Sequence, residues 1–132
     1  MGKERDLKLQ SYNISENRYR ELKYFCKQYR EKQSQLRSIT ELSSPRFDNI
    51  GGGNKISDNT ADTAVRRAQL KKDLEAIEQA AVEAGEELFP HIISNVVDGI
   101  AYEYLGVPAS KTNFYLKRRK FFWILDKKKF GT

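Results

Sequence analysis

Two long segments of the chain show the spacing of hydrophobic residues that is typical of one face of an α-helix. In the first, from about Ser15 to Thr40, such positions recur every three or four residues, with one polar member: Tyr19, Leu22, Cys26, Tyr29, Gln33 and Leu36. Ser15 is a suitable N-cap for this helix. The second runs from about Thr60 to Ala84 and continues the stripe beyond Gly85: Leu70, Leu74, Ile77, Ala81, Ala84 and Leu88.

The segment between them, residues 41–59, has the composition of a loop. It contains Pro45, three consecutive glycines and clustered Ser, Asn and Asp. The glycines lack the Gly-Lys-Ser/Thr ending and the preceding apolar strand of a phosphate-binding loop, so we expect a flexible connection. No stretch alternates as a β-strand does. The pattern therefore predicts an all-α fold with a long antiparallel helical hairpin.

The last part of the chain predicts a helix-turn-helix. A third helix should begin near Pro90, bury Ile92, Ile93, Val96 and Val97, and end at Asp98-Gly99. A short helix over 101–105 would then lead into a turn in which Gly106 takes a left-handed conformation and Pro108 prevents the helix from continuing. Ser110 would cap a recognition helix from Lys111 to about Lys127.

At 100° per residue, one face of this recognition helix is apolar and belongs to the core: Phe114, Tyr115, Phe121, Phe122 and Leu125. Polar and cationic side chains lie opposite or at the edge, where they could contact bases and phosphates in a major groove. The expected DNA-binding residues are Ser110, Lys111, Thr112, Asn113, Lys117, Arg119 and Lys120, with Gly106 and Pro108 forming the turn.

Three details complicate this pattern. Arg118 falls within the apolar face and must extend to solvent or pair with an acid. Trp123 and Ile124 point away from that face and need another surface, either the hairpin or a second subunit. Three residues, rather than the two of the commonest motif, separate Ile100-Ala101 from Leu105. The alternatives are a differently phased first helix or a plain helical corner.

The net charge of +6 is concentrated at the C-terminal end. Residues 101–132 carry eight Lys/Arg and two Asp/Glu, whereas residues 59–100 carry four and eight. A basic end suggests a polyanion such as nucleic acid, with a solubilising tail as the alternative. An acidic run free of Lys and Arg, Asp73 to Glu87, is either a solvated face or a docking surface for the basic end or a basic partner.

The residue types required by common catalytic sites are scarce. The single histidine, His91, and single cysteine, Cys26, exclude multi-histidine and cysteine-rich metal sites, and Cys26 should be a buried, inert thiol. We expect no enzyme activity, no cofactor and no metal. With no apolar run long enough for a membrane helix and no signal-peptide pattern, we expect a cytoplasmic protein without membrane contact.

Three segments carry a resemblance to a known family: RYRELKYFCKQYRE at 18–31, LKKDLEAIEQAA at 70–81, and YEYLGVP…FYLKRRKFFWILDKK at 102–128. Together they resemble small phage and prophage late-operon transcription activators of the RinA and ArpU kind. The C-terminal part is similar to the promoter-binding region 4 of sigma factors. The resemblance implies DNA binding and a role in transcription in a bacterial host cell.

The residues and the resemblance together predict a sequence-specific, DNA-binding transcriptional regulator. The expected divisions are an N-terminal segment with the first helix (1–40), the loop (41–59), the second helix (60–85) and the helix-turn-helix region (86–132). Expected partners are double-stranded DNA, a second copy in a homodimer, and RNA polymerase as a further candidate. The alternatives are a DNA-packaging protein of the small-terminase type and a non-enzymatic interaction module whose basic end binds an acidic partner.

Overall fold

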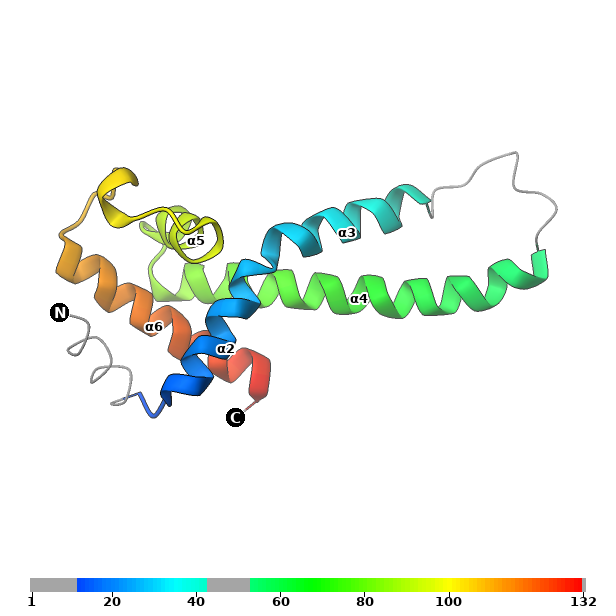
Figure 1. Cartoon of the computed structure of the whole chain (residues 1–132), viewed down its shortest axis with the longest axis horizontal. Helices are drawn as coiled ribbons and strands as arrows, with labels where there is room; N and C mark the ends of the chain where they lie inside the picture. The colour runs from blue at the N-terminus through cyan, green and yellow to red at the C-terminus, as the bar shows by residue number, and fades with distance from the viewer. Residues whose placement is uncertain (1–11, 43–52, 132) are drawn as a thin grey trace.

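The structure, a computed structural model, describes residues 12–42 and 53–131, and every regular element within those ranges is helical (Figure 1). The predicted all-α class is therefore confirmed. The elements are α2 (Glu16–Lys27), α3 (Tyr29–Leu42), α4 (Gly53–Ala84), α5 (Phe89–Asp98), a 3-10 turn η1 (Tyr102–Tyr104) and α6 (Lys111–Phe130). None of these helices combines the length and the apolar character that would let it cross a membrane.

The long helix α4 organises the molecule (Figure 1). Helix α3 runs antiparallel to α4 along one part of its length, which confirms the predicted helical hairpin. Helices α2, α5 and α6 gather around the C-terminal part of α4, and the arm formed by α3 and the beginning of α4 extends away from them. The candidate interface on α6 thus belongs to a packed helical body rather than to the arm.

The core is built from the stripes that the sequence predicted. All six members of the second stripe, Leu70 to Leu88, are buried, and Ala81 and Ala84 are fully enclosed, as close helix packing requires. From the first stripe Leu22, Cys26 and Tyr29 are buried, and Tyr19 and Leu36 pack at its edge. Most of the remainder comes from α5 and α6, and Ile14, Phe25 and Ala80 complete it.

The first predicted helix is not one helix but two. Ser15 caps α2 as expected, accepting a hydrogen bond from the Arg18 amide, but the helix stops at Lys27 and α3 starts at Tyr29. Since α2 packs on α5 and α6 whereas α3 follows α4, the chain must change direction between them.

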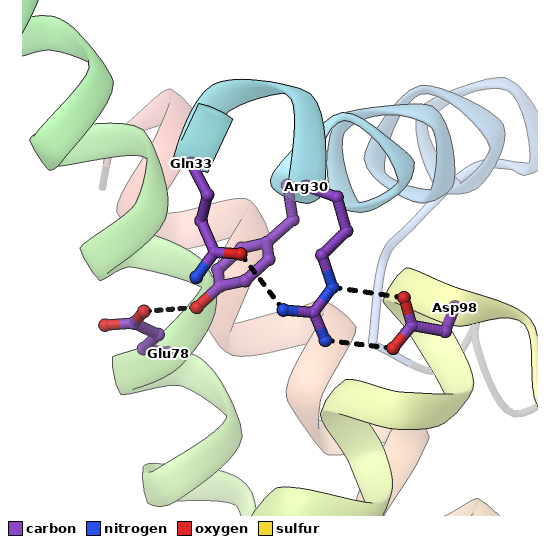
Figure 2. Close-up of polar contacts among 5 residues, drawn as sticks. Arg30, Gln33, Glu78 and Asp98 are labelled. Carbon is purple, nitrogen blue, oxygen red and sulfur yellow. Dashed lines mark hydrogen bonds and ion pairs between the residues drawn. The ribbon is translucent and has the colours of Figure 1, made fainter. Parts of the chain in front are cut away.

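Polar contacts fix this bend (Figure 2). The Arg30 guanidinium donates two hydrogen bonds to the Asp98 carboxylate on α5, at 3.1 and 3.0 Å, and the Tyr29 hydroxyl donates one to Glu78 on α4. The bend is therefore held by residues distant in the sequence.

The predicted loop at 41–59 is too long. Helix α3 continues to Leu42 and α4 already begins at Gly53, so the loop prediction is wrong at both ends, and residues 43–52 lie outside the described part of the chain. Helix α4 can begin this early because no glycine or proline occurs between Gly53 and Gly85 to interrupt a helix. The polar composition of 54–59 matches a solvent-exposed helix as well as a loop.

Helix α5 agrees closely with the sequence. Pro90 lies in its first turn, Ile92, Val96 and Val97 are buried, and Gly99 ends it in a left-handed conformation at φ +70°. Residues 99–110 and the start of α6, which follow α5, lie at one end of the molecule (Figure 1).

Candidate nucleic-acid interface

The predicted turn is present at Gly106. Its φ is +64°, the left-handed region that a residue with a Cβ rarely adopts, and nothing lies within 4 Å of a Cβ placed there. Leu105 and Val107 on either side pack against the core, as the sequence indicated, and Pro108 is exposed in the following bend.

The short helix expected at 101–105 is absent. A single 3-10 turn, Tyr102–Tyr104, takes its place, since Ala101 is extended and the left-handed Gly106 closes the turn. Two hydrogen bonds hold the segment: the Tyr102 hydroxyl donates to the Ala109 carbonyl at 2.5 Å, and the Asn95 amide donates to the Ile100 carbonyl at 2.9 Å. The connection between α5 and α6 is therefore longer than the tight turn of the commonest helix-turn-helix.

The first turn of α6 is built as predicted. The Ser110 side chain accepts a hydrogen bond of 3.1 Å from the Asn113 amide, which makes it the N-cap. Lys111, Thr112 and Asn113 are all exposed. The Lys111 ammonium lies 3.1 Å from Glu103, and a backbone hydrogen bond together with this lysine lowers the pKa of the Glu103 carboxyl. Short polar side chains and unpaired helical amides thus face solvent at this end.

Arg119 is not available to DNA. It is only 5% exposed and lies among the core residues, so its assignment to the interface is wrong. Arg118 is half-buried and pairs with neutral groups, which differs from both expectations, extension to solvent or pairing with an acid: it donates to the Asn95 oxygen at 2.6 Å and to the Tyr19 hydroxyl at 3.0 Å. Arg118 thus ties α6 to the helical body.

The solvent-facing side of α6 is therefore rotated from the predicted one. Beyond Thr112 and Asn113 it continues through Leu116, Lys120, Trp123 and Lys127, which recur at helical spacing and are exposed or half-exposed. Sequence reasoning missed Leu116, Trp123 and Lys127 because it treated Arg119 as an edge residue. We call the set Thr112, Asn113, Leu116, Lys120, Trp123 and Lys127 the outer stripe.

Trp123 and Ile124 find their contacts within the chain. The Trp123 ring packs against Tyr12 with centroids 5.5 Å apart, and the Lys127 ammonium lies 3.8 Å above it. Ile124 is buried in the core cluster. The second surface that these residues required is thus supplied by the protein itself, and they no longer argue for a dimer.

Lys117 and Lys120 lie beside an acidic neighbourhood. They line one surface cavity together with Asn113, with Glu83 in the last turn of α4, and with Glu86 and Glu87 in the connection to α5. The Lys117 Cδ lies 3.6 Å from the position that a Cβ would take at Gly85. The Lys128 ammonium pairs with Glu83 at 2.7 Å. The acidic run thus serves partly as a docking surface for the chain's own basic end.

The single cysteine is built as an inert group. Cys26 is fully buried, and burial raises the pKa of its thiol to about 12, against a smaller opposing effect of the Arg118 charge. Within the described ranges, no three His, Cys, Asp or Glu side chains gather in a way that could hold a metal ion.

The comparisons with known proteins found no match to this chain among family models, curated proteins or solved structures. Its candidate function accordingly rests on the geometry of α6 and on the distribution of charge.

Proposed function

We propose that this chain is a DNA-binding transcriptional regulator of a bacterial cell that contacts duplex DNA through the outer stripe of α6. The observation that carries the proposal is the exposed first turn of α6, where Thr112 and Asn113 lie free of the core and Lys120 and Lys127 follow on the same side. Short polar groups at a helix N-terminus suit base edges in the major groove, and cations further along suit phosphates.

The positions of the other predicted residues support a division of roles. Ser110 caps the helix, and the N-terminal amides beside it would face a phosphate of the bound duplex. Lys111 adds a cation beside the same turn, although its ammonium also pairs with the Glu103 carboxylate. Gly106 and Pro108 set the direction in which α6 leaves the turn. Arg119 has no part in the contact because it is buried.

The partners follow from the small size of this face. One exposed helical turn makes few base contacts, so a homodimer that presents two copies to paired half-sites would raise affinity and specificity. RNA polymerase is a further candidate partner, which an activator of transcription would contact and a repressor would not need. A DNA-packaging protein of the small-terminase type would instead assemble as a closed ring, which light scattering on the purified chain distinguishes from a dimer.

The test is a titration with random-sequence duplexes, followed by selection of the bound sequences. Asn113→Ala should relax the preference at one base position by about 1–3 kcal/mol. Lys120→Glu and Lys127→Glu should weaken binding to all sequences and reduce the salt dependence by about one unit of slope for each phosphate contact. Lys72→Glu, at an exposed position of α4 that is not part of the outer stripe, is the matched control.

One observation favours a second function. The carboxylates of Glu83, Glu86 and Glu87 beside Lys117 and Lys120 oppose the approach of phosphate on that side of α6. A non-enzymatic interaction module whose basic end binds an acidic protein tolerates this arrangement better, because such a partner has a lower density of negative charge than duplex DNA. Absence of binding to any duplex at low salt would favour this function over the first.

A further inference from the structure

A second surface has an unusual combination of apolar and acidic groups, and it shares Val82 and Glu83 with the cavity that Lys117 and Lys120 line. It is a groove of about 590 Å³ where the end of α4 meets the beginning of α5. Val82 from α4 and Phe89, Pro90 and Ile93 from α5 form its apolar wall. Its volume falls within the range of natural binding sites, which is roughly 300–1,000 Å³.

Val82 is the anomaly in this groove. The preceding residues on the outer face of α4 at helical spacing, Glu75 and Gln79, are polar and exposed. Val82 follows them with 37% of its surface exposed, although a polar residue would fit that face equally well. An apolar side chain in a polar face, next to the partly buried Phe89 and Ile93, extends the core to the surface at this point.

The charged side chains that line the groove have one sign. Glu78 and Glu83 line it, and no Lys, Arg or His belongs to its lining. Glu78 is fixed by the hydrogen bond that it accepts from the Tyr29 hydroxyl. Glu83 pairs with Lys128, yet its side chain keeps 52% of its surface exposed. The groove therefore offers an apolar floor between carboxylates that a cationic ligand could reach.

We propose that this groove binds a basic amphipathic segment of another protein, with a bulky apolar side chain against Val82 and Ile93 and Lys or Arg beside Glu78 and Glu83. Charge complementarity selects this occupant, because the groove lies in the region that carries the chain's excess of acid, residues 59–100. A helix laid in a groove with anchors three or four residues apart is an established way to bind such a surface. The proposal does not depend on DNA binding.

The test uses fluorescein-labelled helical peptides of about 14 residues, which is about four turns. The first carries Leu and Phe anchors at helical spacing with Lys and Arg elsewhere. The second has the same anchors with Glu in place of the cations, and the third has the cations with Ala anchors. Fluorescence anisotropy with the full chain should show binding of the first peptide only, weakened by added salt.

Two substitutions with matched controls locate the binding. Val82→Gln should weaken the first peptide about tenfold, since an apolar contact is lost, whereas Val65→Gln, at an exposed valine of the same helix, should not. Gln79→Lys adds a cation to the groove and should weaken the same peptide severalfold, whereas Gln35→Lys on α3 should not.

Three outcomes would overturn the proposal. They are equal binding of the basic and acidic peptides, equal effects of Val82→Gln and Val65→Gln, and no binding of any peptide. Light scattering that shows a dimer lost in Val82→Gln would also overturn it, because a second copy would then occupy the groove. The peptide results do not bear on the duplex titration, which Val82→Gln should leave unchanged as long as the oligomeric state is unchanged. Loss of a dimer would weaken duplex binding as well.

Discussion

The Arg118 Nε donates a hydrogen bond of 2.6 Å to the Asn95 Oδ1 and thereby ties the middle of α6 to α5. The same guanidinium donates to the Tyr19 hydroxyl of α2 and lies 5.0 Å from the centre of the Phe122 ring. One side chain therefore joins three helices. It also explains how a cation is accommodated within the apolar face of α6.

Replacing this arginine should cost more than replacing an exposed one. Arg118→Met leaves the Asn95 oxygen without its donor and should lower the free energy of unfolding by about 1–3 kcal/mol. Arg20→Met, which removes only an exposed pair with Glu16, should cost less than about 0.5 kcal/mol. Urea denaturation measures both, and similar losses would show that Arg118 does not hold the helices together.

The turn before α6 gives a second prediction. Gly106→Val should destabilise the fold by about 1 kcal/mol or more, because a β-branched residue is strained at φ +64°. Gly85→Ala is the control, since its φ is not in the left-handed region and its Cβ would make ordinary contacts with Lys117. Thermal unfolding of the two variants compares them, and a Gly106→Val variant as stable as the parent would contradict the left-handed turn.

Cys26 should be unreactive in the folded protein. With the pKa of its thiol raised to about 12, almost no thiolate exists at pH 8, and burial blocks access by a reagent. An aromatic disulfide reagent should label the chain only after unfolding in guanidinium chloride. Rapid labelling of the native chain at this pH would show that Cys26 is accessible.

Alkaline pH should destabilise the fold through two groups. Burial raises the pKa of Cys26, ordinarily 9.0, to about 12, and burial with the Glu78 contact raises the pKa of Tyr29, ordinarily 10.0, to about 12. Because both folded-state values lie above the unfolded ones, their contribution is complete below about pH 9 and is lost as the pH rises towards 12. Each group changes the free energy of unfolding by up to about 1.4 kcal/mol per pH unit.

Urea denaturation between pH 8 and pH 11 measures this loss. Cys26→Ala should make the decline shallower without abolishing it, because Tyr29 still titrates. An identical slope in the parent and the variant would contradict the raised pKa of the thiol.

Lys117 should contribute to stability only, whereas Lys127 should also contribute to duplex binding. Lys117→Glu places a further carboxylate in the cavity that Glu86 and Glu87 line, so it should lower stability by about 0.5 kcal/mol. Lys127→Glu lies on the outer stripe and should weaken duplex binding. It also removes the ammonium that lies 3.8 Å from the Trp123 ring, which should cost about 0.5–1 kcal/mol of stability. Denaturation curves and duplex titrations of both variants measure these effects. If Lys117→Glu weakened duplex binding and Lys127→Glu did not, Lys117 would belong to the DNA contact.

Local features of this protein could be read from the sequence alone. The structure agrees with the sequence-based prediction for several of them: the stripe from Leu70 to Leu88, the caps at Ser15 and Ser110, the ends of α5 and the left-handed Gly106. Each depends on helical periodicity or on the conformational preference of one residue, and these act over a few neighbouring positions.

The tertiary structure alone decided the bend after Lys27 and the exposed side of α6. The bend depends on Arg30 and Asp98, which lie far apart in the sequence and meet only when α5 folds against α2 and α4. Helix α6 contacts α2 and α4 and is tied to α5, so it carries core residues on most of its sides. Periodicity cannot select the free face of a helix that is covered from several directions, and Arg119 was assigned to DNA for that reason.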